Sequence, residues 1–296
     1  MRIGTAEPGS TFLAQGVALK TLLESKGVTN NVDVVIALSA SIENAEELDR
    51  GSIDFGFMAS NWIGRALRGE APFKAPIDLR MVAPANAGPL FFIARADSSL
   101  KTVSDLRGRR VCVGPAKSGM AQHADTMFRA LGFEAGDVTV INLDFAQGAQ
   151  ALRTGEIDAQ LQCPIPNRVM SALDQDTDLR ILEWGDDLAR ALAFQPLYRP
   201  TRLLPGQLRC VTHETAQPAV VNVIVTHARA DAAMVKSVAA AIVGNATALT
   251  QLEPLYTGLP DLFEPLRTQG ASAFEFSGVP LHEGAKAAYR AAGFLA

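Results

Sequence analysis

The sequence predicts an α/β protein of two lobes, each a mostly parallel β-sheet flanked by helices, with a two-strand hinge between the lobes. Two observations carry this prediction: a repeated unit of strand, glycine loop and helix, and a repeated segment that ends a helix and starts a buried strand. Alternating strands and helices indicate parallel sheets, because parallel neighbours need a crossover connection that is usually helical.

A glycine loop opens each copy of the repeat. A short strand leads into Gly4–Gly9 in the first copy, and Arg110–Val113 leads into Gly114–Gly119 in the second. Both loops read glycine, four residues, glycine, and both precede a stretch with apolar residues at helical spacing. The two predicted helices end near Gly27 and Gly132.

The second repeated segment has the pattern Leu-x-x-Gly-x-Ile-Asp, in Leu48–Asp54 and again in Leu152–Asp158. Physically it describes the last turn of a helix, a glycine in the left-handed C-terminal position and the start of a buried strand. A further strand is predicted inside each copy, over Val32–Leu38 and Val138–Leu143. Each half therefore has the order β–loop–α–β–α–β.

The remaining apolar segments predict connections between the lobes. Strands are expected at Leu79–Ala83, Leu90–Ala94 and Val220–Thr226, and we interpret these as the segments that cross from lobe to lobe. Helices expected at Ala232–Leu249 and Glu283–Ala292 would then return to the first lobe. The predicted first lobe is discontinuous, residues 1–87 and 220–296, and the second lobe is residues 88–219.

Composition excludes some function classes. The chain has 296 residues, a net charge of −4 and no run of Lys or Arg, so we expect no nucleic-acid partner. Its longest apolar stretches are too short to span a bilayer. The three cysteines fit no metal motif, and we expect unpaired, buried or half-buried thiols. No metal or cofactor is expected, and we expect a monomer.

The two glycine loops are the predicted binding site. In parallel α/β sheets, ligands bind outside the carboxyl ends of the strands, and a helix N-terminus there favours an anion. We expect a carboxylate to be held by Ser10, Thr11 and the backbone around Gly9 on one side, and by Lys117, Ser118 and Gly119 on the other. The alternative is that the glycines only permit tight turns.

Polar residues also follow the second and third strands of the first lobe. Ser39 stands at a strand end and is a candidate ligand contact, whereas Ser41 is expected to be a helix N-cap. Ser60 and Asn61 follow the third strand, and Gln162 precedes the corresponding segment of the second lobe, 163–167. Phe12 and Trp62 either wall an apolar part of the ligand or belong to the core.

Enzyme motifs are incomplete in this sequence. The first glycine loop carries Ser10 where a nucleotide-binding P-loop needs lysine. No Gly-x-Ser-x-Gly elbow occurs, Ser98–Lys101 lacks the companion motifs of Ser-x-x-Lys enzymes, and His282–Glu283 has no second histidine. The histidines are therefore expected to be structural, with attention to His123 in the helix after Gly119. We expect a protein that is not an enzyme.

Several segments together resemble the TAXI family (TRAP-associated extracytoplasmic immunogenic proteins), the solute receptors of one class of TRAP transporters. The resemblance covers nearly the whole chain and is most specific in two blocks. The segments that carry it are Ile3–Thr5 with Pro8–Gly9 and Thr11–Phe12, Ser39–Asn44, Gly51–Phe55, Val103–Val111, Val113–Gly114 with Ser118–Gly119, and Pro280–Ala285. The specific blocks are Ser39–Asn44 and Pro280–Ala285.

This resemblance implies a type II-like periplasmic binding protein outside the cytoplasm, which closes on a small organic acid such as glutamate or a dicarboxylate. It also implies a membrane subunit of a TRAP transporter, driven by an ion gradient, as partner. The binding residues it implies are Thr5, Glu7, Gly9, Ser10, Thr11 and Phe12, then Ser39, Ser41, Ser60 and Asn61, then Lys117, Ser118, Gly119 and Met120.

The sequence departs from the pattern of that family at the predicted site. Glu7 and Ser10 replace small residues, Ser60–Asn61 lies within a changed segment, and Met120 stands where threonine is common. Glu7 would repel a plain dicarboxylate and pair with an amine, which favours an amino acid, unless it points to solvent. An ABC-type or sensory binding protein is the first alternative, and a periplasmic-fold enzyme is less favoured.

We expect Met1–Gly4 to enter a strand directly, rather than to open a secretory signal. We expect a periplasmic protein whose signal has been removed; a cytoplasmic protein is the alternative that the sequence leaves open.

Overall fold

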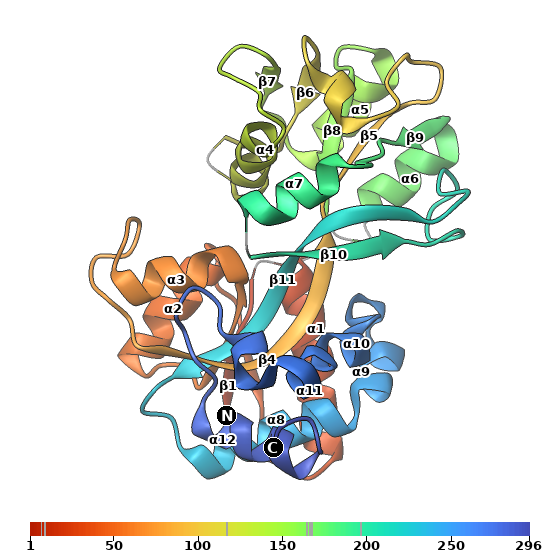
Figure 1. Ribbon diagram of the computed structural model, residues 1–296. Helices are drawn as coiled ribbons and strands as arrows, with labels where there is room; N and C mark the ends of the chain where they lie inside the picture. The colour runs from red at the N-terminus through yellow and green to blue at the C-terminus, as the bar shows by residue number, and fades with distance from the viewer. Residues whose placement is uncertain (7, 9, 117, 164, 166–167, 196) are drawn as a thin grey trace. The chain divides into compact units, whose positions relative to one another are not determined.

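The computed structural model describes residues 1–6, 8, 10–116, 118–163, 165, 168–195 and 197–296. Two compact units make up the chain (Figure 1): unit 1 is Met1–Ala87 with Val221–Ala296, and unit 2 is Gly88–Val220. The chain passes between them twice, once within β4 (Leu79–Pro89) and once within β11 (Thr215–His227). Each unit is described by itself below.

Unit 1 is built on three parallel strands, in the order β2, β1, β3. β11 adds next to β3 in the antiparallel sense, with Asn222 opposite Ala59, and β4 also pairs with β11. The sheet is therefore mixed. The bounds are β1 Arg2–Gly4, α1 Thr11–Ser25, β2 Asp33–Val35, α2 Ser41–Arg50, β3 Phe55–Ala59 and α3 Ser60–Arg68.

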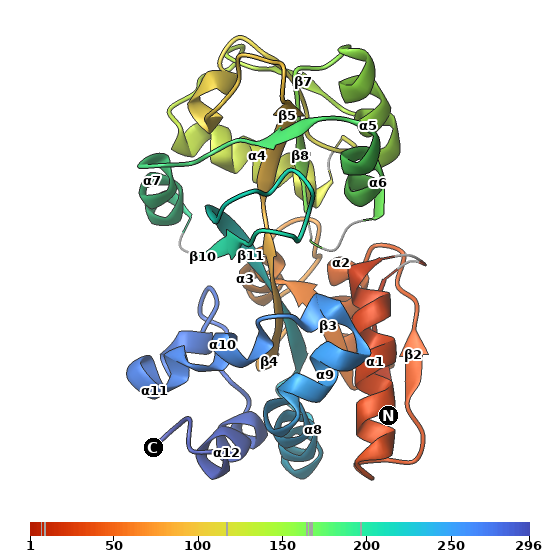
Figure 2. The same ribbon diagram turned by 90° about the vertical axis from the view of Figure 1, so that its right-hand side faces the viewer.

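The C-terminal quarter of the chain supplies the helices that complete unit 1. α8 (Ala232–Gly244) and α12 (Glu283–Ala291) pack against each other, so closely that a Cβ at Gly284 would lie 2.4 Å from the Ala232 carbonyl oxygen. In Figure 2, α1 lies beside β2 and α9 (Ala246–Leu252). Shorter helices follow: η2 Pro254–Tyr256, α10 Leu259–Phe263, α11 Pro265–Gln269 and η3 Gly270–Phe274.

Unit 2 repeats the parallel triplet, in the order β7, β6, β8. β5 lies antiparallel to β8, and β9 lies antiparallel to β5 at the end of the sheet. β10 pairs with the first half of β11. The strands are β5 Phe91–Arg95, β6 Arg110–Cys112, β7 Thr139–Ile141, β8 Ala159–Gln162, β9 Leu179–Ile181 and β10 Tyr198–Leu203. The helices are η1 Val103–Leu106, α4 Gly119–Ala130, α5 Phe145–Thr154, α6 Arg168–Asp176 and α7 Asp187–Phe194.

The α/β fold with sheets flanked by helices confirms the predicted fold class, and it needs two corrections. The sheets are mixed rather than mostly parallel, because the segments from Leu79 onward and around Val220 add to the triplets as antiparallel strands. The single helix expected over Ala232–Leu249 is two helices, since Asn245 leaves the helical conformation, with φ −134° and ψ 29°, and donates its side-chain amide to the Ala241 carbonyl.

Within the described part of the chain, no single helix has the length and apolar character needed to cross a membrane. The bent pair α8 and α9 meets that test only when both helices are taken together, with a 75° bend between them.

Candidate functional site

The loop after β1 begins with a residue that is turned into the protein. Thr5 is fully buried, and both its backbone N–H and its hydroxyl donate to the Val35 carbonyl, at 2.9 and 2.8 Å. Its hydroxyl oxygen therefore has only acceptor capacity left for a ligand. Close packing continues into α1, where a Cβ at Gly16 would lie 2.4 Å from the Thr5 methyl group.

Ser10 and Phe12 close this loop onto α1. The Ser10 side chain caps the helix by accepting from the Leu13 N–H at 3.3 Å, while Thr11 is half-buried. The Phe12 ring is 9% exposed and stacks on Phe57 with ring centroids 5.7 Å apart, so it belongs to the core of unit 1. Glu7 and Gly9, two predicted binding residues, lie outside the described residues.

The end of β3 carries a hydroxyl and an amide that are available for binding. Ser60 opens α3; it is fully buried, and within the described chain its Oγ has no hydrogen-bond partner. The Oδ1 of Asn61, the next residue, is buried and likewise has no partner there. Leaving such groups unpaired costs about 1–3 kcal/mol each, so both atoms are candidates for a further hydrogen bond.

Ser41 is not the N-cap of α2, so that prediction is wrong. The N-cap is Ala40, in an unusual conformation with φ 48°, and the Ser41 hydroxyl instead accepts from the Ala59 N–H at 3.1 Å. A long-range bond to the end of β3 replaces the local one because Ser41 already lies inside the helix. The structure thereby holds Ser41 next to the segment that carries Ser60.

Asn44 is the side chain that ties this end of the sheet together, and its role was not predicted. Its Nδ2 donates to the Thr5 carbonyl at 2.8 Å and to the Phe57 carbonyl at 2.9 Å, which joins the residue after β1 to the middle of β3. Gly4 leaves the space for it, since a Cβ there would lie 2.3 Å from Asn44 Oδ1. Thr5 and Ser60 are thus attached to one rigid framework.

Two other predicted residues make contacts on their own elements. Ser39 is exposed, and its N–H and hydroxyl both donate to the Glu43 carboxylate, at 3.2 and 3.4 Å. The half-buried Trp62 ring meets Phe73 edge-on at 6.4 Å, and the Arg65 guanidinium lies 4.8 Å from its centroid. Among the described residues, neither side chain forms a hydrogen bond with Thr5, Asn44 or Ser60.

A buried amide cluster in unit 1 was missed by the sequence analysis. Asn86 of β4 accepts from Gln15 Nε2 at 3.3 Å and from Asn222 Nδ2 at 3.1 Å, and the Gln15 Oε1 has no partner among the described residues. Asn222 also pairs with Ala59 across the sheet, directly before Ser60. The available signal was an asparagine within each of two apolar runs, around Asn86 and Asn222.

The corresponding loop of unit 2 repeats the helix cap. Ser118 caps α4 by accepting from the Ala121 N–H at 3.1 Å, and Met120 is half-buried in the first turn of the helix that Gly119 opens. Gly114 has φ +89°, and a Cβ there would lie 3.1 Å from the Met120 Cβ, so this glycine is needed for the turn. Lys117, predicted to face an anion, lies outside the described residues.

The other polar groups of unit 2 come from β8, α4 and β10. Gln162 is buried at the end of β8, opposite Phe91. His123 Nδ1 lies 2.9 Å from the Tyr198 hydroxyl, and burial lowers the pKa of His123 to about 4, so this ring is neutral near pH 7. Arg199 follows Tyr198 and is half-buried; desolvation lowers its pKa from the ordinary arginine value, and the guanidinium stays charged.

These groups suit the binding of an anion. In unit 1 the described candidates are neutral hydroxyls and amides beside a helix N-terminus. In unit 2, taken by itself, Arg199 is a half-buried cation. Among the described residues, no group of three or more His, Cys, Asp or Glu side chains is arranged to hold a metal ion. The three cysteines are unpaired, with Cys112 buried and Cys163 and Cys210 half-buried, as the sequence predicted.

Comparison with known proteins decides the family. The model of the NMT1-like family matches residues 3–293. The chain belongs to the NMT1-like family.

Solved structures agree on the fold of this NMT1-like protein. The periplasmic aliphatic sulphonate binding protein SsuA from Escherichia coli is 18% identical with a TM-score of 0.51, over 88% of this chain and 78% of that one. A putative sulfonate ABC transporter protein, the periplasmic sulfonate-binding protein SsuA from Methylobacillus flagellatus KT, is 15% identical with a TM-score of 0.55, over 100% and 87%. The second substrate-binding domain of GlnP from Lactococcus lactis, in an open conformation, is 10% identical with a TM-score of 0.50, over 87% and 94%. The fold is that of the two-lobed periplasmic binding proteins.

One of the two most specific segments of the TAXI resemblance has a structural explanation in this NMT1-like protein. In Pro280–Ala285, Leu281 bridges to Met81 of β4, the His282 ring accepts from the Gly284 N–H at 3.1 Å as N-cap of α12, and Gly284 permits the contact with α8. His282 is 5% exposed and structural, as expected from the sequence.

Proposed function

We propose that this NMT1-like protein is the extracytoplasmic receptor of an ABC-type transporter, and that it binds a small organic anion by closure of its two units. The family match supports a solute-binding role. Two solved structures of similar fold are of sulfonate-binding proteins, and one of these is a putative sulfonate ABC transporter protein. Closure is favoured when a ligand contacts both units and so binds the closed form more tightly.

The observation that carries the proposal is the buried hydroxyl of Ser60 at the start of α3. It has no hydrogen-bond partner among the described residues, and it lies beside free N–H groups at a helix N-terminus. A hydroxyl donor and helix N–H groups match an oxoanion. Arg199, half-buried in unit 2, is the cation that we assign to the same ligand on closure.

The ligand class is a sulfonate or a carboxylate, and both present oxygens to the same donors. Sulfonates take precedence in the proposal because both sulfonate-binding relatives have a TM-score above 0.5. The glutamate-like amino acid or dicarboxylate suggested by the TAXI resemblance is the second class. We also propose that Glu7, Gly9 and Lys117 contact the ligand, as expected from the sequence.

Binding is tested by calorimetry and thermal shift with ethanesulfonate, taurine, glutamate, succinate and sulfate. We expect micromolar binding of at least one organic anion. Ser60→Ala should weaken it about tenfold, the cost of one charge-assisted hydrogen bond, and should not lower the unfolding temperature of the free protein, because it removes a buried hydroxyl without a partner. Ser39→Ala is the matched control, since the Ser39 hydroxyl donates to Glu43. The proposal fails if no anion binds, or if a substrate is turned over.

Two further variants test the contribution of unit 2. Arg199→Gln should weaken anion binding at least tenfold, whereas Arg202→Gln on the same strand should not, because Arg202 is exposed and ion-paired with Glu214. Ser118→Tyr should abolish binding while it destabilises unit 2 by only about 1 kcal/mol, the worth of a helix cap. Unchanged affinity in both Arg199→Gln and Ser118→Tyr would remove unit 2 from the site.

A TRAP receptor is the second candidate, favoured by the segments Ser39–Asn44 and Pro280–Ala285. The two candidates differ in the energy source of the membrane partner. Uptake of the identified ligand into vesicles with the partner subunits should require ATP for an ABC-type transporter. Uptake that follows a sodium gradient without ATP would support the TRAP alternative.

A further inference from the structure

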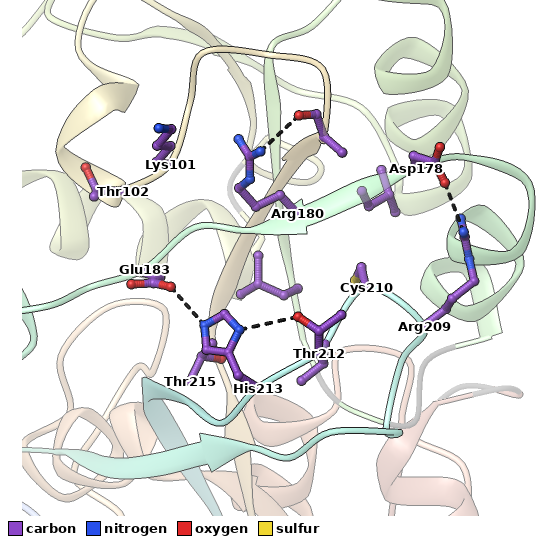
Figure 3. Close-up of a pocket in the computed structure, with 14 residues that line it drawn as sticks. Lys101, Thr102, Asp178, Arg180, Glu183, Arg209, Cys210, Thr212, His213 and Thr215 are labelled. Atoms are coloured by element: carbon purple, nitrogen blue, oxygen red, sulfur yellow. Dashed lines mark hydrogen bonds and ion pairs between the residues drawn. The ribbon is translucent and has the colours of Figure 1, made fainter.

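A cavity of about 690 Å³ lies along the outer edge of β9 in unit 2 (Figure 3). Its lining includes Leu179 and Ile181 of β9, the segment Lys101–Thr102 and the segment Arg209–His213. None of these residues belongs to the candidate binding residues described above. The volume falls within the usual range of ligand pockets, about 300–1,000 Å³.

The hydrogen bonds of β9 alternate between its two sides. On the β5 side, the Asp178 carbonyl accepts from the Ala96 N–H at 2.8 Å and the Leu182 N–H donates to the Phe92 carbonyl at 2.9 Å, with Arg180 opposite Ala94 between them. In an antiparallel pair, the intervening residues direct their N–H and C=O groups away from the partner strand. Leu179 and Ile181 therefore direct theirs toward the cavity.

Beyond the end of β9, at Glu183, the same outer edge is paired with the segment Lys101–Val103. The Glu183 N–H donates to the Lys101 carbonyl, and the Val103 N–H donates to the Glu183 carbonyl, both at 3.0 Å. This parallel pairing stops at Lys101. Among the described residues, no backbone hydrogen bond from outside β5 reaches Leu179 or Ile181. The edge thus has a gap of about three residues, roughly 10 Å of strand, open to the cavity.

The charges around the gap favour a negative occupant. Arg180 is half-buried and donates to the carbonyls of Leu100 and Ala96, at 2.9 and 3.0 Å, with no carboxylate partner in the described chain. Lys101 is exposed and forms no ion pair there either. The two lining carboxylates are engaged, Asp178 by Arg209 at 2.9 Å and Glu183 by His213 at 3.0 Å (Figure 3).

We propose that the outer edge of β9 is a docking site for an extended acidic segment of a partner protein. The segment adds to the sheet as a short strand, with its backbone bonded to Leu179 and Ile181 and a carboxylate directed to Lys101 and Arg180. Main-chain bonds to an exposed strand edge supply affinity in this mode of recognition, and side-chain charge supplies selectivity. A small solute anion does not satisfy two N–H and two C=O groups arranged in a line.

Fluorescence anisotropy with labelled synthetic peptides tests the proposal on the full chain. The probe is the acetylated hexapeptide Thr-Glu-Val-Glu-Thr-Glu, compared with its Lys-for-Glu counterpart and with a version N-methylated at alternate residues. We expect the acidic peptide to bind, and to bind at least tenfold more tightly than both others. Methylation removes backbone donors without a change of charge, so equal binding of the methylated peptide overturns strand addition.

Two variants locate the site. Ile181→Pro removes one outward N–H without loss of a β5 hydrogen bond, because proline is tolerated on an edge strand with its nitrogen facing outward. Since the Ile181 side chain is 5% exposed and belongs to the core of unit 2, Ile181→Ala, which keeps the N–H, is its matched control. Ile181→Pro should reduce peptide affinity at least fivefold, with folding checked by Trp184 fluorescence. Lys101→Glu should weaken binding similarly, and Lys26→Glu, an exposed site of unit 1 with the same change of charge, should not.

Two other results would overturn the proposal in favour of another occupant. Self-association of the protein that Ile181→Pro abolishes would make a second copy the occupant. Displacement of the peptide by millimolar citrate, with no effect of Ile181→Pro, would indicate a simple anion site.

Discussion

The two copies of the repeat build the same framework with the same contacts. In unit 1 the Arg2 N–H donates to the Asp54 carboxylate at 2.8 Å, and in unit 2 the Arg110 N–H donates to the Asp158 carboxylate at 2.8 Å. Each aspartate ends the repeated Leu-x-x-Gly-x-Ile-Asp segment. The side chain thereby fixes the register of the strand that precedes each glycine loop, which explains why the aspartate recurs.

The copies differ in how they fill the space between helix and sheet. In unit 1 the helix α2 supplies Asn44, and glycines at 4 and 56 on the strands make room for it. In unit 2 the strand β8 supplies Gln160, which donates to the Phe145 carbonyl at 3.1 Å, and the glycine is Gly148 on the helix. Counted from the shared motif, Asn44 corresponds to Gly148 and Gly56 to Gln160.

In each copy, one side-chain amide fills the space between helix and sheet. It comes from the helix in unit 1 and from the strand in unit 2. Asn44 donates to two carbonyls and holds the segments of the candidate site together. Gln160 donates to one carbonyl, that of Phe145 at the start of α5. Equivalent positions of the repeat therefore need not carry equivalent residues. The two tryptophans make this comparison measurable, since Trp62 belongs to unit 1 and Trp184 to unit 2.

The largest expected difference between the units is their response to acid. The unfolded chain protonates His123 near pH 6.5, but the folded unit 2 resists protonation until about pH 4. Stability is therefore lost as the pH falls between these values, by about 3 kcal/mol in total. Urea unfolding followed by Trp184 in a Trp62→Phe background should report this loss.

His123→Gln is the control for that experiment, because glutamine can bond to Tyr198 and does not titrate. The variant should remove most of the loss in unit 2. The smaller acid response of unit 1, where burial lowers the pKa of His227 and His282, should persist. An unchanged pH profile of unit 2 would assign the loss to another group.

The next largest effects should come from replacement of the two amide side chains, Asn44 and Gln160. Asn44→Leu leaves two buried carbonyls without their side-chain donor and should destabilise unit 1 by roughly 2–4 kcal/mol; Gln160→Leu leaves one and should cost unit 2 roughly 1–2 kcal/mol. Unfolding by urea, followed by the tryptophan of each unit, measures both values. Equal losses would contradict the bracing role of Asn44.

Gly148→Ala probes the filled space directly. The new Cβ would lie 2.4 Å from Gln160 Nε2 and 2.8 Å from Cys112 Sγ, so overpacking should cost unit 2 about 1–3 kcal/mol. The loss should be partly recovered with Gln160→Ala, giving a coupling energy above roughly 0.5 kcal/mol. Gly244→Ala, which meets no atom within 4 Å, is the matched control. Strict additivity would show that the two residues do not compete for space.

The smallest effects should come from the helix caps, where the copies agree. Ser10→Ala and Ser118→Ala each remove one side-chain acceptor from a first helical turn and should cost about 1 kcal/mol. The two losses should be similar, and additive in the double variant, because the caps belong to different units. A loss confined to one of them, measured by thermal unfolding, would show that the loops are not equivalent.

Local patterns made much of this architecture predictable. Gly51 and Gly155 take the left-handed conformation at the ends of their helices, with φ 73° and 79°, as the repeated motif predicted. A glycine at a helix end is read from its neighbours alone. The glycine loops were also located at helix N-termini correctly, since a strand, a loop and a helix follow each other directly in sequence.

The features that escaped prediction depend on residues far apart in the chain. Asn86, Gln15 and Asn222 meet only after β4 and β11 have joined the sheet, and the Ser41 hydroxyl finds Ala59 rather than its own helix. The open edge of β9 could not be predicted either. A strand with neighbours on both sides and a strand with a neighbour on one side have the same local sequence pattern. Hydrophobic periodicity indicates which residues are buried, but it does not indicate which segment of the chain buries them.

Because the chain leaves unit 1 within β4 and returns to it within β11, the two units become complete at different times during synthesis. Residues 88–220 are continuous and complete unit 2 as soon as they leave the ribosome, whereas unit 1 must wait for the strand that holds Asn222 and for α12. Domains fold as units while the chain grows at about 5–20 residues per second, so unit 1 spends several seconds without its closing strand and helices. The part of the protein made first is thus the last to receive all the strands and helices that it packs against, and until β11 is in place one edge of β3 lacks its partner strand.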